Sequence, residues 1–290
     1  MSLSRTLLLG AIAGVTILLG LPVGRLRRPA HGLRVVLNAA ATGVLVFLLW
    51  DVLSAAWEPI DGALAAVHTG EGGLAPALGY GVLFAGGLAV GLLGLVAYEQ
   101  WMKRRGRALT RNYGPGAMTI GELGTGRLGI AGWSAARRLA LLIAVGIGLH
   151  NFAEGLAIGQ SAASGDIALA TVLVIGFGLH NATEGFGIVA PLAGGPADAD
   201  VDRPSWAFLA GLGAVGGGPT FLGAALGHGF TSEPLSVAFL TLAGGSILYV
   251  VVQLLGIAAK ARRSDLVAYG LLLGLLAGFA TDAVITAAGV

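Results

Sequence analysis

Apolar residues run along this chain in long stretches, and the short polar connections between them give eight separate segments. The hydrocarbon core of a bilayer is about 30 Å thick and needs about 20 apolar residues per helix. Within each stretch the polar positions recur with a helical period, and the stretches are too long for barrel strands. We therefore predict an all-α, polytopic membrane protein. The predicted spans are 6–23, 35–57, 77–101, 139–160, 167–190, 206–227, 235–258 and 267–287.

The first stretch also has the basic start of a secretory signal peptide, since Arg5 precedes an apolar run. Signal peptides usually carry an apolar run of about 7–15 residues and end at a small-x-small cleavage site. This run is longer, and no clear site of that kind ends it. We therefore interpret 6–23 as the first span.

Composition agrees with a lipid-embedded chain. The 290 residues are 56% hydrophobic and only 11% charged, and the mean hydropathy is +0.84. Soluble domains carry about 25% charged residues, so this chain has too little polar surface to face water all round. We expect one multi-pass transmembrane domain over 1–290, located in the cytoplasmic (inner) membrane. The absence of cysteine excludes disulfide frameworks and thiolate metal sites.

Basic residues predict the orientation, because cytoplasmic connections carry an excess of Lys and Arg. If the N-terminus lies outside, the connections after the odd-numbered spans and their flanks hold sixteen of the seventeen basic residues. Only Arg5 falls on the other side. This predicts both termini outside and a cytoplasmic loop over 102–134. The pI near 9.2 then reflects topology, and we expect no nucleic-acid partner.

Fifty glycines are many even for a membrane protein. Several of them fall four residues apart, an arrangement that lets helix backbones approach closely in a bilayer. This spacing predicts a compact bundle. The clearest examples are Gly10 and Gly14, Gly87 and Gly91, and the series Gly270, Gly274 and Gly278.

One polar motif occurs twice in the middle of apolar spans. The stretch GIGLHNFAEGLAIG begins at Gly146, and GFGLHNATEGFGIV begins at Gly176; eight of the fourteen positions are identical. The two spans run antiparallel, so this direct repeat in sequence becomes an inverted repeat in space, with both copies near the membrane midplane. Inverted repeats with a site at the midplane are a recurrent transporter design.

The residue types and spacing within the motif suit a metal ion. Residues three and four apart share a helix face, so His150, Asn151 and Glu154 lie together, and His180, Asn181 and Glu184 repeat them. Imidazole with carboxylate suits zinc and similar divalent first-row ions. Each acid at mid-membrane costs about 3 kcal/mol, and neither span has a basic residue in its interior. A cation from outside the chain is the natural compensation.

Other roles for the motif stay open at this point. Buried His, Asn and protonated Glu side chains can tie helices together by hydrogen bonds, and chains of Glu and His can carry protons without a metal. A metal-dependent intramembrane enzyme is a further alternative. A zinc protease helix needs His-Glu-x-x-His, however, and neither span has two histidines four apart. We expect no enzyme activity.

In the sequences HNFAEG and HNATEG, on consecutive middle spans of an eight-span protein, the chain resembles the ZIP (Zrt/Irt-like) divalent-metal transporters. The signature of that family is His-Asn-x-Pro-Glu-Gly on the fourth span, with a related motif on the fifth. The resemblance implies a 3+2+3 inverted-repeat bundle and transport of zinc, or of iron, manganese or cadmium, toward the cytoplasm. It implies that the ligands or near-ligands are His150, Asn151, Glu154, His180, Asn181 and Glu184.

The chain departs from the family pattern at several positions. Ala153 and Thr183 replace the motif proline, so any kink must come from neighbouring glycines. The seventh span offers only Gln253 where relatives often have an acid, so a second metal position would carry less charge. Asp51 could lie along the access path. The loop over 102–134 has no histidine and so lacks the metal-sensing tract of some relatives.

We therefore predict a divalent-cation transporter that favours zinc and uses the ion as its substrate. A passive metal-selective channel with the same site is the alternative. The expected partners are the cation and the lipid bilayer, with a homodimer as an option.

Overall fold

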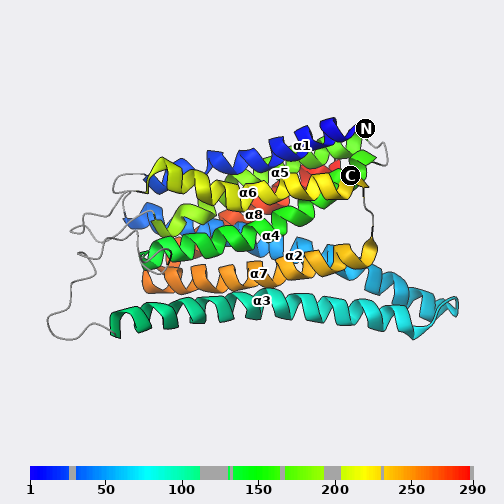
Figure 1. Cartoon of the computed structure of the whole chain (residues 1–290), viewed down its shortest axis with the longest axis horizontal. Coiled ribbons are helices and arrows are strands. Elements are labelled where there is room, and N and C mark those ends of the chain that lie inside the picture. The colour runs from blue at the N-terminus through cyan, green and yellow to red at the C-terminus, as the bar shows by residue number, and fades with distance from the viewer. Residues whose placement is uncertain are drawn as a thin grey trace.

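The chain forms a bundle of long helices that lie roughly side by side (Figure 1). This computed structural model describes residues 1–25, 31–111, 130, 133–163, 167–192, 204–229 and 232–287, and these residues contain no β-strand. The α-helices are α1 (Leu3–Val15), α2 (His31–Thr69), α3 (Leu74–Arg111), α4 (Ala135–Ala163), α5 (Ile167–Val189), α6 (Trp206–Gly229), α7 (Glu233–Lys260) and α8 (Ser264–Ala287).

The all-α prediction is confirmed for the described residues. Within the described residues, seven helices are long and apolar enough to cross a membrane. α5 forms a further helix where the span 167–190 is predicted. α1 is shorter than expected: it ends at Val15, and two 3₁₀ segments continue the chain to Arg25.

α2 and α3 are longer than predicted. α2 runs to Thr69 and α3 starts at Leu74, so the expected connection 58–76 shrinks to a tight turn. Gly70 makes this turn with a φ of 77°, a left-handed conformation that suits glycine. Apolar length alone misses the extension, because the segment DGALAAVH is rich in helix-forming alanine. Similarly, α3 continues to Arg111, ten residues into the predicted cytoplasmic loop, whose residues 112–129 and 131–132 lie outside the described part.

The helices pack in two groups. α1, α4, α5 and α6 contact one another, and α4 packs most extensively on α6. In the second group α2 packs on α8 and α7, and α3 packs on α7. α4 against α7, and α5 against α2 and α8, join the groups.

Glycine creates the closest approaches, as the spacing predicts. A Cβ atom added to Gly14 of α1 would collide with the carbonyl oxygen of Gly217 in α6, and a Cβ on Gly217 would collide with that of Gly14. Between α4 and α6, a Cβ on Gly155 would collide with the Thr220 carbonyl and lie 2.9 Å from the Ala224 nitrogen. These helices therefore touch through their backbones, without an intervening side chain.

The glycine contacts recur in pairs. A Cβ on Gly43 of α2 would meet the backbone of Leu271 and Leu275 in α8, and one on Gly245 of α7 would meet Leu88 and Leu92 in α3. The two contacts have the same pattern: a carbonyl oxygen, then a nitrogen four residues later.

A matching pair of close glycine contacts occurs where α1 and α6 meet the two motif helices. Gly155 contacts the Thr220 carbonyl, whereas Gly185, its counterpart in the second motif copy, contacts the Ile17 carbonyl just after α1. The two motif helices therefore meet their neighbours in matching ways.

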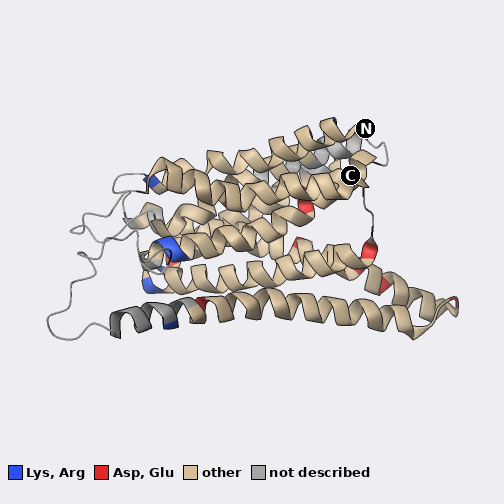
Figure 2. Cartoon of the chain, viewed as in Figure 1, with Lys and Arg blue, Asp and Glu red and all other residues tan. Residues whose placement is uncertain are grey.

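The two ends of the bundle differ in charge. Lys and Arg gather at the end where α4 and α6 begin and α7 ends, and both chain termini lie at the other end (Figures 1 and 2). We call these the basic end and the termini end. A core of fully buried aliphatic side chains fills the bundle toward the basic end, including Ile143 and Ile147 of α4, Leu209 and Leu212 of α6, and Leu254 of α7.

We predict that Gly223→Ala destabilises the protein. Its Cβ would collide with the Phe152 carbonyl and lie 2.9 Å from the Leu156 nitrogen. Such overpacking costs about 1–3 kcal/mol, which exceeds the gain of up to about 1 kcal/mol from replacing a helical glycine by alanine. Thermal unfolding in detergent should give a lower Tm than wild type.

Gly218→Ala, in the same helix, is the matched control. A Cβ there meets nothing within 4 Å, so its Tm should equal or exceed that of wild type. An equal fall in both variants would contradict the backbone-contact explanation.

Candidate functional site

The two motif copies meet inside the bundle, where α4 crosses α5. His150 lies midway along α4, and its Nε2 atom is 3.0 Å from Oε1 of Glu154, one turn later on the same helix. The same Nε2 atom is 3.9 Å from Oε1 of Glu184 on α5. One imidazole therefore lies between two carboxylates that come from different helices.

These side chains are out of contact with water. The exposed fractions of His150, Glu154 and Glu184 are 2%, 5% and 2%. The i,i+4 spacing places His150 and Glu154 on one face of α4, and the α4–α5 crossing brings Glu184 against that face. Electrostatic interactions are stronger at such a dry site than in water, so the local charge balance matters greatly here.

The two asparagines hold the flanking helices. Nδ2 of Asn151 donates a hydrogen bond to the Gly216 carbonyl in α6 at 3.0 Å, and Nδ2 of Asn181 donates one to the Ala13 carbonyl in α1, also at 3.0 Å. Both asparagines are fully buried. Their Oδ1 atoms have no hydrogen-bond partner among the described residues, so each amide oxygen is available to a ligand.

The helices that these asparagines contact each carry a helix-disrupting feature nearby. Near Ala13, α1 gives way to a 3₁₀ segment at Thr16, whose hydroxyl also donates to the Ala13 carbonyl at 2.6 Å. Pro219 lies inside α6, three residues after Gly216, and lacks the N–H group of a regular helix. α1 and α6 therefore complete the site, which motif spacing alone did not indicate; the proline within an apolar span was the one available signal.

The expected set of six residues is brought together only in part. Five of the six side chains are described and buried at the α4–α5 crossing; the side chain of His180 lies outside the described part of the structure. Within the described side chains, no group of three or more His, Asp or Glu has the arrangement of a ready-made metal site. α4 and α5 run as continuous helices through Ala153 and Thr183, the positions that replace the motif proline.

The two secondary candidates lie in the second helix group. Asp51 is half-buried on α2, and Gln253 is half-buried on α7. α2 contacts α5 and α7 contacts α4, so both residues belong to helices that pack against the motif helices.

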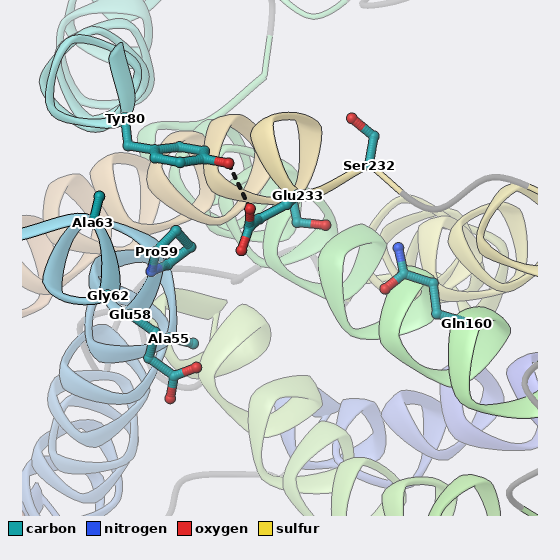
Figure 3. A pocket seen from close by; sticks show the side chains of 10 residues that line it. Ala55, Glu58, Pro59, Gly62, Ala63, Tyr80, Gln160, Ser232 and Glu233 are labelled. Atoms are coloured by element: carbon teal, nitrogen blue, oxygen red, sulfur yellow. Dashed lines mark hydrogen bonds between the residues drawn. The ribbon is translucent and has the colours of Figure 1, made fainter. Parts of the chain in front are cut away.

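A separate pocket of about 730 Å³ opens at the termini end (Figure 3). The hydroxyl of Tyr80 on α3 donates a hydrogen bond to Oε2 of Glu233 at 2.5 Å, and Glu58 and Gln160 also line the pocket. Gln160 lies six residues beyond Glu154 on α4, about 9 Å along the helix axis. The pocket therefore lies on the termini-end side of the buried site, whereas aliphatic side chains fill the bundle toward the basic end.

Comparison with known proteins adds no assignment. No protein-family model matches the chain, and no curated protein matches it. Any functional assignment therefore depends on the chemistry of the site and on the motif resemblance.

Proposed function

We propose that this protein is a transporter of divalent metal cations, with zinc as the favoured substrate. The observation that carries the proposal is the position of His150 between the carboxylates of Glu154 and Glu184, buried inside a bundle of membrane-spanning helices. One imidazole and two carboxylates are ligands that suit Zn²⁺ and related first-row ions. His180, Asn151 and Asn181 are the proposed further ligands.

Charge balance supports a cationic substrate. Two ionised carboxylates bring two negative charges to the site, and the interiors of α4 and α5 contain no Lys or Arg. Isolated charges in a low-dielectric interior are costly, and protonation of His150 would compensate only one of them. A divalent cation would balance both while exchanging its water ligands for nitrogen and oxygen atoms of the protein.

The paired contacts support a 3+2+3 inverted repeat. Exchanging α1, α2 and α3 with α6, α7 and α8, and α4 with α5, converts the α4–α6 contact into α5–α1 and the α2–α8 contact into α7–α3. All four contacts are present. The glycine pairs Gly43 with Gly245 and Gly155 with Gly185 follow the same exchange. Inverted repeats of this kind allow a central site to open alternately to either side.

The conformation suggests how access is controlled. The site is occluded, because its acids are at most 5% exposed. The pocket beside Gln160 approaches it from the termini end, and the aliphatic core closes it toward the basic end. With the basic end cytoplasmic, an ion would enter from outside through the pocket and leave once the aliphatic layer separates. The exposed acids Glu58 and Glu233 give the pocket a negative potential that attracts cations.

Zinc uptake tests this proposal directly. Proteoliposomes with a trapped zinc indicator should accumulate zinc through the wild-type protein. The double variant Glu154→Gln, Glu184→Gln should lose at least about 90% of the uptake rate, because each replacement of a carboxylate by an amide removes one formal charge from the site. Glu71→Gln, which changes an exposed acid in the α2–α3 turn, should transport normally.

Equal rates in the wild type and the double variant, with both proteins folded, would show that the motif only ties helices together. If uptake is lost as expected, counterflow of trapped zinc would identify a carrier; its absence would favour the passive channel.

Ligand roles can be separated by affinity. We expect Glu154→Gln to weaken zinc binding by more than about 100-fold, since it removes charge from the ion's surroundings. Asn151→Ala removes the anchor to Gly216 and should cost about 10- to 100-fold, the range for groups that orient a metal site. Isothermal titration of the two purified variants makes the comparison; equal losses would make the amide a ligand of similar weight.

The proposed topology is accessible to labelling, because the native chain has no cysteine. A membrane-impermeant maleimide added to intact cells should modify Glu71→Cys, in the α2–α3 turn at the termini end. Arg104→Cys, exposed near the other end of α3, should react only after permeabilisation. The reverse pattern would place the basic end outside and invert the proposed direction of transport.

A further inference from the structure

The pocket at the termini end has the size of a small-molecule site rather than that of an ion site. Its volume is about 730 Å³, within the range of about 300–1,000 Å³ for pockets that hold organic ligands. Residues of four helices line it, namely α2, α3, α4 and α7 (Figure 3). A bare metal ion would leave most of this volume to water.

Two carboxyl groups give the pocket its charge. Glu58 of α2 and Glu233 at the start of α7 are both exposed, and Figure 3 shows their carboxyl groups apart from each other. The described residues that line the pocket include no Lys, Arg or His. Oε2 of Glu233 accepts the hydrogen bond from Tyr80, a hydroxyl that leaves the charge in place. The pocket therefore carries two separate negative groups.

The pocket also offers hydrogen-bond acceptors that lack their usual donors. Pro59 lies inside α2 and has no N–H group, so the carbonyl of Ala55, four residues earlier, loses its helical donor. Ser232 is the N-cap of α7, yet its side chain makes no capping hydrogen bond. All three residues line the pocket. These acceptors suit a ligand that is rich in N–H donors.

Apolar and aromatic surfaces accompany the polar groups. Ala55, Pro59 and Ala63 share one face of α2, because residues four apart are neighbours on a helix. The ring of Tyr80 extends from α3 toward Glu233 (Figure 3). The alanine and proline carbons provide a surface for methylene groups, and the face of an aromatic ring attracts a ligand cation.

From these features we infer that the pocket binds a linear aliphatic diamine or polyamine. An ammonium group carries three N–H donors and no acceptor, so it can use a carboxylate together with a neighbouring carbonyl or hydroxyl. Two ammonium groups joined by a methylene chain match two separate carboxylates beside an apolar wall. A single metal ion instead requires ligands that converge on one point. The inference does not rest on metal transport, because binding is measured without it.

Equilibrium dialysis of the purified protein in uncharged detergent against radiolabelled 1,4-diaminobutane tests the site. Loss of one exposed ion pair weakens binding by up to about fivefold, so Glu58→Gln with Glu233→Gln should bind the diamine about 10-fold more weakly than wild type. The matched control is Asp61→Asn with Glu71→Gln. It removes two exposed acids of the α2–α3 hairpin that do not line the pocket, and it should bind like wild type. Equal weakening in both double variants would overturn the site in favour of a diffuse charge effect.

The ligand class has a test of its own. Tyr80→Phe keeps the ring and should bind the diamine like wild type, whereas Tyr80→Leu should bind it about threefold more weakly, because a cation–π contact is lost. Mg²⁺ has the charge of the diamine but no methylene chain, so it should displace the label only at higher concentration than unlabelled diamine does. Equal displacement by Mg²⁺, or equal affinity of the two Tyr80 variants, would overturn the diamine assignment in favour of a general cation site.

Discussion

Contact between helix backbones at glycine is the interaction on which the rest of this structure depends. In a bilayer, lipid chains are as apolar as leucine, so helices do not associate to escape water; they associate where they pack closely and where polar groups meet. Gly14 and Gly217 let α1 touch α6, and Gly155 and Gly223 let α4 touch α6. These contacts fix the spacing of the helices around the motif side chains. Without them, the hydrogen bonds from Asn151 to Gly216 and from Asn181 to Ala13 could not span the gap.

The buried acids are tolerable only because that scaffold surrounds them with polar partners. His150 lies within 4 Å of both Glu154 and Glu184, and the amide groups beside them bond to backbone carbonyls of α6 and α1. Aliphatic side chains close this buried set of nitrogen and oxygen atoms toward the basic end.

Much of this could be predicted from the sequence. Helical apolar runs gave the spans, because lipid imposes one length and one kind of secondary structure. The repeated motif predicted that α4 and α5 meet, and the i,i+4 pairing of His150 with Glu154 followed from helix geometry. The sequence did not predict the partners of the asparagines, because these partners are backbone carbonyls, which every residue has. It also missed the extension of α2 and α3, where helix propensity continues after the apolar run ends, and the pocket that Tyr80 and Glu233 close from distant parts of the chain.

The length of α2 has a practical consequence. Its 39 residues span about 58 Å at 1.5 Å per residue, nearly twice the hydrocarbon thickness of about 30 Å. The α2–α3 hairpin extends beyond the other helices at the termini end (Figure 1), so part of it would stand outside the lipid. A membrane protein of 29.0 kDa with little mass outside the lipid gives image-processing software little to align in single-particle microscopy. The α2–α3 hairpin offers an epitope for an antibody fragment, which would allow the orientation of each particle to be determined.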